Sequence, residues 1–324
     1  MKKFLAIILV VILALGVVAC KKEGPKKASL TMGTGGESGT YFAVGGVLAN
    51  VLNEKNPDTM SVNVVSTGGS ADNLQNMATG VYQLATVQSD VMTYAYNGTR
   101  SFEKTGAVPN VRILAGIYAE TVQIVTCNPD IKSVADLKGK NVCVGDVGSG
   151  TYFNTVDILA AYDMTIDDVN PVYQSFGDST ESLKDGKIDA ALLTAGAPTT
   201  AVVDLATSNS VYLVSIDDEH MEKLLEACPW YAAYTIPAGT YKGFDEDAVT
   251  VTVKATLICS ASLEDDVAYA IVSMIYDNAE AIAELHSKGA ELSLEFATEG
   301  IAVPFAKGAA QYFAEHGIEV DTVD

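Results

Sequence analysis

Glycine-rich turns carrying hydroxyl groups are the residues of this chain best suited to chemistry. Residues 33–40 read Gly-Thr-Gly-Gly-Glu-Ser-Gly-Thr, residues 66–70 read Ser-Thr-Gly-Gly-Ser, and residues 148–151 read Gly-Ser-Gly-Thr. Glycines let the backbone approach a ligand closely, and the N–H groups that open a helix favour an anion. The turns therefore indicate that a small anion is bound by backbone and hydroxyl groups. Tight strand-to-helix geometry alone is the alternative explanation of the glycines.

Two further strand ends add polar groups to this set. Gln88 and Ser89 follow a strand, whereas Asp90 beside them also fits the N-cap of the next helix. Residues 197–199 place a proline at the first position of another helix. The candidate ligand-binding residues are Gly35, Thr40, Tyr41, Gly69, Ser70, Gln88, Ser89, Ser149, Gly150, Thr151, Ala197, Pro198 and Thr199.

Known catalytic and cofactor motifs are missing from the sequence. Gly33-x-Gly35-x-x-Ser38-Gly39 nearly matches the dinucleotide fingerprint, but its last glycine is one position late and no acidic residue ends a second strand about 20 residues on. There is no G-x-S-x-G elbow, P-loop or H-E-x-x-H motif. The three histidines, at 220, 286 and 316, show no metal-ligand spacing. We therefore expect a protein that is not an enzyme and that needs neither cofactor nor metal.

Strands that alternate with helices must position these turns. A strand at 30–33 precedes the first turn and a helix at 41–53 follows it, and the same alternation restarts at 141–145. Such alternation predicts parallel sheets with helices on both faces, whose ligands bind beyond the carboxyl ends of the strands. Further strands are predicted at 112–118 and 122–127, and a long one returns at 249–259. We therefore expect an α/β protein of two lobes with a ligand cleft between them.

The charge and composition of the chain limit which partners and ligands it can bind. The 324 residues include 20 basic and 41 acidic ones, a formal net charge of −21, which repels phosphate backbones and predicts no nucleic-acid partner. Arginine, the usual bidentate clamp for a carboxylate, occurs only at Arg100 and Arg112. An anionic ligand must therefore rely on N–H groups, hydroxyls, helix dipoles or a lysine. A disulfide between Cys127 and Cys143 and free buried thiols are both compatible with the cysteine spacing.

The first twenty residues have the pattern of an export signal. Two lysines precede an apolar run at residues 4–18, and Cys20 follows Ala19 directly. This run is shorter than the roughly 20 residues of a membrane span. It resembles a lipoprotein signal, with residues 1–19 removed, Cys20 acylated and residues 20–28 as a tether; an ordinary cleaved signal and an uncleaved anchor are the alternatives. We expect a lipid-anchored extracytoplasmic protein, in the periplasm or on the outer face of the cell membrane.

Ordered motifs across the chain resemble the TAXI family of solute receptors. Besides the turns above, these motifs are Tyr118-Ala119-Glu120, Asp136-Leu137-Lys138-Gly139-Lys140, Gly186-x-x-Asp189-Ala190, Ala195-Gly196-Ala197-Pro198-Thr199 and Pro237-Ala238-Gly239-Thr240-Tyr241. The resemblance runs from residue 30 to about 317. TAXI proteins are the extracytoplasmic receptors of tripartite ATP-independent periplasmic (TRAP) transporters.

The resemblance implies a type II-like periplasmic-binding-protein fold that closes on a small organic anion, such as glutamate, glutamine or a dicarboxylate, and delivers it to TRAP permease subunits. We expect a monomer, with lobe I at 29–123 plus 237–324, lobe II at 124–236, and hinges near 122–125 and 235–239. An exported enzyme, a solute-sensing lipoprotein and an ABC-type receptor are the alternatives.

Three positions depart from the TAXI pattern. Glu37 replaces a small or neutral residue, Tyr118-Ala119-Glu120 lacks a proline before its glutamate, and Val303-Pro304-Phe305-Ala306 lacks a histidine. Glu37 and Glu120 are therefore candidates for contact with a ligand ammonium or with the hinge. This favours an amino acid such as glutamate, unless Glu37 points to solvent.

Overall fold

The computed structural model describes residues 27–323. The predicted signal, the acylation site at Cys20 and most of the predicted tether lie outside these residues. Within 27–323, no helix combines the length and the apolar character needed to cross a membrane. The cysteines of this part of the chain, at 127, 143, 228 and 259, are free thiols, so no Cys127–Cys143 bridge forms.

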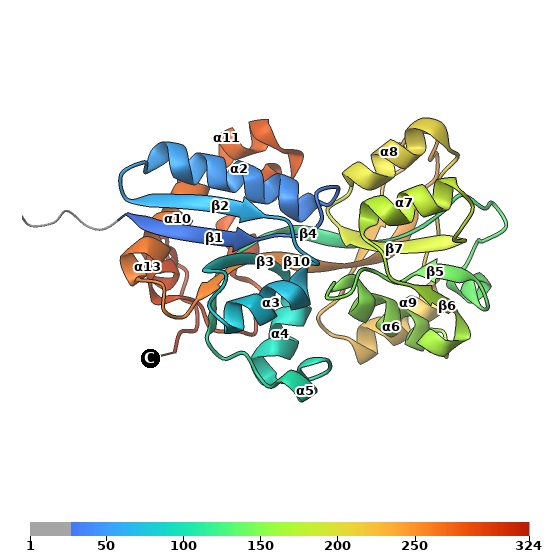
Figure 1. Ribbon diagram of the computed structural model, residues 1–324, viewed down its shortest axis with the longest axis horizontal. Coiled ribbons are helices and arrows are strands. Elements are labelled where there is room, and N and C mark those ends of the chain that lie inside the picture. Colours follow the sequence, from blue (N-terminus) through green and yellow to red (C-terminus); the bar gives the residue numbers. More distant parts are fainter. Residues whose placement is uncertain (1–26, 324) are drawn as a thin grey trace, which may run out of the picture.

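A single mixed sheet runs through both lobes of the molecule (Figure 1), in the order β2-β1-β3-β10-β4-β7-β5-β6, with β8 paired to β4 and β9 to β10. Its strands are β1 (Ala28–Gly33), β2 (Met60–Val65), β3 (Leu84–Gln88), β4 (Val111–Thr126), β5 (Asn141–Cys143), β6 (Asn170–Val172), β7 (Ala190–Ala195), β8 (Tyr212–Leu213), β9 (Ala232–Ile236) and β10 (Ala248–Ser260).

Helices pack around the sheet in two groups. The first lobe carries α2 (Thr40–Lys55), α3 (Ser70–Ala78), α4 (Ser89–Asn97), α5 (Phe102–Thr105), α10 (Asp265–Asp277), α11 (Ala279–Leu285), α12 (Leu294–Thr298) and α13 (Lys307–Glu315). The second lobe carries α6 (Thr151–Ala161), α7 (Phe176–Lys184), α8 (Thr200–Ser208) and α9 (Asp218–Ala227). Short 3-10 helices are η1 (Val134–Leu137), η2 (Ile166–Asp168) and η3 (Ser287–Glu291).

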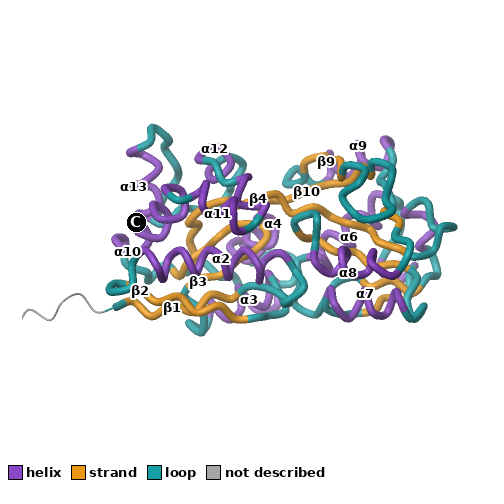
Figure 2. The backbone as a smooth tube through the Cα atoms, turned by 90° about the horizontal axis from the view of Figure 1, so that it is seen from above, coloured by secondary structure: helices purple, strands orange, loops and turns teal. Residues whose placement is uncertain are grey.

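Two long strands, β4 and β10, connect the lobes (Figure 2). The prediction of wholly parallel sheets is wrong at this place, because β10 is antiparallel to both β3 and β4, and β4 is antiparallel to β7. The short strands β8 and β9 also pair antiparallel, with β4 and β10 respectively. The pairs β1–β2, β1–β3, β5–β6 and β5–β7 are parallel, as expected. The two strands predicted at 112–118 and 122–127 are one continuous strand.

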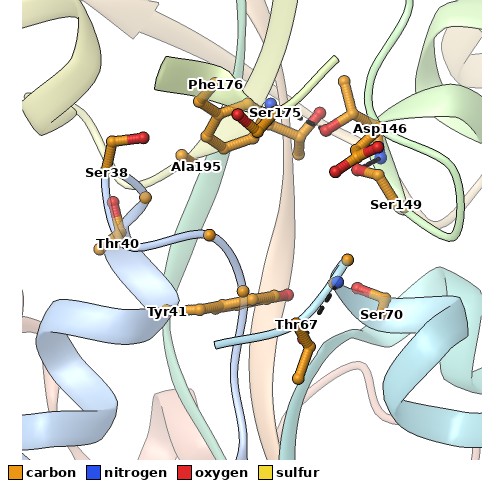
Figure 3. A pocket seen from close by; sticks show the side chains of 18 of the residues that line it. Ser38, Thr40, Tyr41, Thr67, Ser70, Asp146, Ser149, Ser175, Phe176 and Ala195 are labelled. Carbon is orange, nitrogen blue, oxygen red and sulfur yellow. Dashed lines mark hydrogen bonds between the residues drawn. The ribbon is translucent and has the colours of Figure 1, made fainter. Parts of the chain in front are cut away.

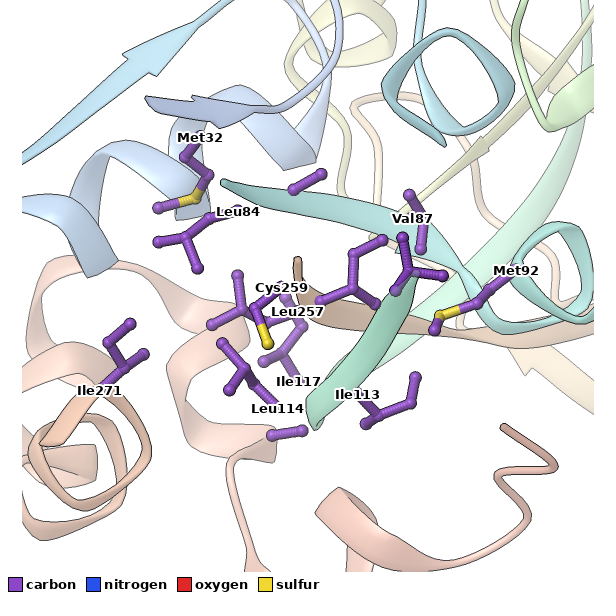
Figure 4. Close-up of a cluster of buried hydrophobic side chains, with 14 of the residues drawn as sticks. Met32, Leu84, Val87, Met92, Ile113, Leu114, Ile117, Leu257, Cys259 and Ile271 are labelled. Carbon is purple, nitrogen blue, oxygen red and sulfur yellow. The ribbon is translucent and has the colours of Figure 1, made fainter. Parts of the chain in front are cut away.

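The hydrophobic cores show where the chain changes lobes. The first-lobe core, part of which Figure 4 shows, includes Ile117 of β4 and Leu257 of β10. The same two strands give Ile124 and Val251 to a second-lobe core. A third cluster contains Leu193 together with Ile236, Tyr241, Phe244 and Ala248. The segment from residue 237 to residue 248 thus packs with the second lobe. The chain returns to the first lobe only within β10, at a point further along the sequence than the hinge expected at 235–239.

Gly308 allows α13 to approach α10 closely. A Cβ atom at this position would overlap the carbonyl oxygen of Asp265 and lie 2.6 Å from the backbone nitrogen of Tyr269. We expect Gly308→Ala to lower the free energy of unfolding by about 1–3 kcal/mol, because backbone atoms cannot move aside as a flexible side chain can. Urea denaturation measures this. Gly46→Ala, at a helical glycine with open space around it, is the matched control and should not destabilise.

Candidate ligand-binding site

A cavity of about 480 Å³ lies between the lobes, at the carboxyl ends of β1, β2, β3, β5 and β7 (Figure 3). Its lining consists of Gly35, Gly36, Glu37, Ser38, Gly39, Thr40, Tyr41, Ser66, Thr67, Gly68, Gly69, Ser70, Gln88, Glu120, Asp146, Ser149, Gly150, Thr151, Ser175, Phe176, Thr194 and Ala195. This volume lies within the range of about 300–1,000 Å³ that is typical of small-molecule binding sites.

Most of the candidate residues from the sequence meet in this cavity. Those that line it are Gly35, Glu37, Thr40, Tyr41, Gly69, Ser70, Gln88, Glu120, Ser149, Gly150 and Thr151. These residues come from both lobes. Within each lobe the carboxyl ends of the parallel strands lie at the same edge of the sheet, and this brings the turns that follow them together.

Four candidates do not line the cavity. The Ser89 hydroxyl instead accepts a hydrogen bond from the backbone N–H of Lys254 at 3.3 Å. Ala197 and Pro198 precede α8, which begins at Thr200, so the proline is not at the first helical position. Thr199 is buried and its hydroxyl accepts from Gln123 Nε2 at 2.8 Å. Ser89 thus ties α4 to β10, and Thr199 ties the start of α8 to β4, outside the cavity lining.

Some lining residues are not among the candidates named from the sequence. The turn at residues 66–70 was identified, but only Gly69 and Ser70 were named from it, whereas the cavity is also lined by Ser66, Thr67 and Gly68. Ser175 and Phe176 were not singled out by any sequence pattern; α7 begins at Phe176, and the Ser175 side chain is its N-cap, accepting from the N–H of Asp178. In Figure 3, Phe176 of the second lobe and Tyr41 of the first lie on opposite sides of the cavity, and both rings supply apolar surface to its lining.

Glu120 is a buried carboxyl group on the first-lobe side of the cavity. Tyr41 donates a hydrogen bond from its hydroxyl to Glu120 Oε2 at 2.6 Å, and Glu120 is only 1% exposed. Burial raises the pKa of Glu120 to about 8; the hydrogen bond from Tyr41 opposes this rise, Asp90 adds to it, and Lys288 opposes it. The side chain is thus mostly protonated at neutral pH and ionises readily when a cation arrives.

Positive side chains are absent from the described lining, which instead includes the acids Glu37, Glu120 and Asp146. The donors available to a ligand are hydroxyls and N–H groups at the start of α2, which helix geometry leaves without intrahelical acceptors. At the start of α6, the N–H of Thr151 already donates to Ser149 Oγ at 3.1 Å and that of Phe153 to the Gly150 carbonyl at 3.0 Å, so this helix contributes chiefly through its dipole. Such a site can hold a carboxylate at a helix N-terminus and an ammonium group near an acid.

The lobes touch each other on two sides of the cavity. The Gly148 carbonyl of the second lobe accepts hydrogen bonds from the N–H groups of Ala71 (2.9 Å) and Asp72 (3.2 Å) at the start of α3. On the other side, the Ser38 carbonyl accepts from the N–H of Ala201 at 3.2 Å. Thr40 Oγ1 also donates to the Gly196 carbonyl at 3.0 Å. The lobes are therefore in a closed arrangement.

A buried polar network joins the lobes behind the cavity, with Asn154 of α6 at its centre. Asn154 Oδ1 accepts from Gln88 Nε2 at 2.7 Å, and Asn154 Nδ2 donates to Asp90 Oδ2 at 3.1 Å and to the Tyr231 hydroxyl at 2.7 Å. Asp90 lies inside the first turn of α4 and is not its N-cap, contrary to one sequence interpretation. Burial raises the pKa of Asp90 to about 7, with a further increase from Asp157.

An ion pair extends this network toward solvent. Arg100 of the first lobe lies 2.8 Å from Asp157 Oδ1 of the second, and its guanidinium stacks on the Tyr94 ring at 4.5 Å. Asp157 is 7% exposed, so removing its partner would leave a nearly buried charge.

We expect Arg100→Gln to lower the free energy of unfolding by about 2–3 kcal/mol, less than for a fully buried pair because Arg100 is partly exposed. The variant should also populate a more open form, seen as a larger radius of gyration in solution scattering. Arg112→Gln is the matched control, because the Arg112 guanidinium donates to the nearby carbonyls of Pro109 and Val111 and, within residues 27–323, forms no ion pair between the lobes. Equal effects of the two substitutions would contradict the interlobe role.

No group of three or more histidine, cysteine, aspartate or glutamate side chains is arranged to hold a metal ion within residues 27–323.

Comparison with known proteins supports this architecture. The solved structures that share the fold include a protein of Bordetella bronchiseptica RB50, with 18% identity and a TM-score of 0.54 over 93% of this chain and 86% of the other. A ligand-binding component of an ABC-type import system from Staphylococcus aureus, with zinc bound, gives 11% identity and 0.52 over 92% and 86%. The GluR0 ligand-binding core of Nostoc punctiforme, in complex with L-glutamate, gives 13% and 0.50 over 80% and 98%.

These similarities establish the two-lobed α/β fold of solute-binding proteins. The family model described as NMT1-like matches residues 32–317, which is most of the sequence. The chain belongs to the NMT1-like family.

Proposed function

We propose that this protein is an extracytoplasmic solute receptor of the TAXI type, which closes on a small amino acid such as glutamate or glutamine. The observation that carries the proposal is a cavity enclosed between two touching lobes and lined by helix N-termini and hydroxyls. The receptor binds and releases its solute without chemistry. In this role, closure distinguishes the loaded receptor from the empty one, since a ligand shifts the lobes only through differential affinity.

The charges of the lining support an amino acid over a simple dicarboxylate. A carboxylate would sit at the first turns of α2 and α6, near Thr40 and Thr151. An α-ammonium group would lie near Glu120, where the buried carboxyl would ionise to form a pair. A dicarboxylate without an amine would face Glu37, Glu120 and Asp146 with no compensating cation among the lining residues.

Location and partner follow from the sequence patterns. Acylation at Cys20 would hold the receptor on the outer side of a membrane, and the TAXI motifs favour TRAP permease subunits as the recipients of the solute. An ABC-type importer and a signalling partner are compatible with the same binding mode. A monomeric receptor is compatible with delivery of the solute to a TRAP permease and to an ABC-type importer.

Thermal unfolding of the purified protein in the presence of candidate solutes tests the proposal. Denaturation and refolding before the measurement remove any co-purified solute. L-glutamate or L-glutamine should stabilise the protein by about 2.7 kcal/mol at a hundredfold excess over Kd. Succinate and 2-oxoglutarate, which lack the ammonium group, should act more weakly, and Glu120→Gln should reduce this preference. Stabilisation by no amino acid, or stronger stabilisation by the dicarboxylates, would contradict the proposed solute.

A further inference from the structure

A buried lysine lies behind the wall of the solute cavity. Lys288 belongs to η3, is only 5% exposed and is not among the residues that line the cavity. Its ammonium group donates to Glu291 Oε1 at 2.6 Å, within the same short helix. Burying a charge is costly even when it is paired, and an exposed position on η3 would have avoided that cost. The place of Lys288 in the fold therefore indicates a role beyond this ion pair.

Lys288 is attached to the strand that carries Glu120. Glu291 Oε2 accepts from the N–H of Ala119 at 2.7 Å, and Ala119 is the residue before Glu120 on β4. The Lys288 ammonium group also lies 6.0 Å from the centre of the Tyr118 ring. Alternate residues of a strand share a face, so Tyr118 and Glu120 point to the same side of β4. The ammonium group is thus held on the side of the strand from which Glu120 reaches the solute cavity.

The second lobe covers the stem of Lys288. A Cβ atom added at Gly196 would lie 2.6 Å from Lys288 Cε and 3.0 Å from Thr40 Cγ2. The Gly196 carbonyl accepts from Thr40 Oγ1 at 3.0 Å, which is one of the contacts between the lobes. Lys288 therefore lies where the two lobes meet, between the start of α2 and the turn that follows β7.

The titratable groups around Glu120 and Lys288 come from several elements. They are Tyr41 of α2, Asp90 of α4, Tyr118 of β4, and His286 and Glu291 at the two ends of η3, with Glu37 and Asp146 in the cavity lining. Burial raises the pKa of Glu120 and Asp90 adds to this rise, whereas the hydrogen bond from Tyr41 and the charge of Lys288 oppose it. Burial and Lys288 lower the pKa of His286, which is therefore neutral at pH 7. Lys288 is thus the cation among these groups in the described part of the chain.

We propose that Lys288 is a positioning residue of the solute site: from behind the cavity wall it stabilises the ionised form of Glu120, which pairs with the ammonium group of the solute. The inference rests on the proposed function, because it takes the solute to be an amino acid. As the solute binds, Glu120 loses its proton to solvent. Lys288, Glu291, Glu120 and the solute ammonium then hold two positive and two negative charges. Without Lys288, two carboxylates would share one cation.

The pH dependence of stability tests the coupling without any solute. In the unmodified protein, the decline in the free energy of unfolding that Glu120 produces should end near pH 8. Lys288→Met/Glu291→Gln removes both charges of the ion pair, and the new amide oxygen can still accept from Ala119. Because loss of the Lys288 charge raises the pKa of Glu120, the decline should extend to higher pH in this variant. Urea denaturation at several pH values measures this, and in a Glu120→Gln background the same double substitution should leave the slope between pH 7 and 9 unchanged.

Titration calorimetry with L-glutamate and L-glutamine tests the positioning role. The affinity of the unmodified protein should rise with pH and level off near pH 8, because pairing needs the Glu120 carboxylate. Lys288→Met/Glu291→Gln should bind about tenfold more weakly at pH 7, and its affinity should level off only at a higher pH. Lys288→Arg keeps the cation and should restore the pH at which the affinity levels off. Lys184→Met/Glu181→Gln, which removes an ion pair of α7, is the matched control and should leave both profiles unchanged.

Two results would overturn the inference. One is an unchanged decline of stability in Lys288→Met/Glu291→Gln. The other is a solute affinity whose pH profile is the same in this variant as in the unmodified protein. Failure of the unmodified protein to bind either amino acid at any pH would instead contradict the proposed function, and the stability measurement would still show whether Lys288 acts on Glu120.

Discussion

Gly150→Val is expected to hold the lobes apart and to abolish solute binding while both lobes stay folded. Gly150 has an ordinary helical φ of −68°, so a side chain there does not strain the backbone. A Cβ atom, however, would overlap Gln88 Oε1 across the cavity and lie 3.1 Å from Ser70 Oγ. Gln88 cannot simply turn away, because Asn154 holds its amide nitrogen at 2.7 Å.

Solution scattering measures this effect without knowledge of the solute. The variant should keep a large radius of gyration in the presence of L-glutamate, and its affinity for L-glutamate should fall at least a hundredfold. Gly46→Val, at a helix position with no neighbouring atom within 4 Å, is the matched control and should close normally. Compact scattering of Gly150→Val with solute would show that this contact does not limit closure.

The turns after the strands could be predicted because their chemistry is local. Glycine and hydroxyl residues at 33–40, 66–70 and 148–151 signal where strands end and helices begin, and parallel pairing then places them at one edge. The long strand β4 could not be recognised in the same way. Its polar stretch around Glu120 looks like a break between two short strands, yet it is where the strand passes the cavity between the lobes.

Contacts between distant segments explain the rest of what sequence reasoning missed. Asn154 and Asp157 look like ordinary polar positions of a helix, and only the closed fold brings them to Gln88, Asp90 and Arg100. Phe176 enters the cavity because α7 begins earlier than its apolar pattern suggests. Local patterns therefore identified much of the cavity lining but not the network that joins the lobes.

The second large effect concerns the pH dependence of stability, which should depend strongly on Glu120. The pKa of its carboxyl rises from about 4.5 to about 8 on folding, mainly by burial. The folded state therefore holds a proton that the unfolded state has lost between these values, so the free energy of unfolding falls as the pH rises from about 4.5 to 8. Asp90, whose pKa rises to about 7, adds a similar decline over a narrower range.

Glu120→Gln should remove the first of these two declines. The amide oxygen still accepts the hydrogen bond from Tyr41 and never ionises, so the variant should match the unmodified protein near pH 4.5 and exceed its stability at pH 9 by about 3–5 kcal/mol. Urea denaturation at several pH values measures this. Tyr41→Phe should move the decline to higher pH, because the hydrogen bond from Tyr41 lowers the pKa of Glu120. If Glu120→Gln left the slope unchanged, Glu120 would be ionised in the folded protein, and an ammonium group of the solute could pair with it without displacing a proton.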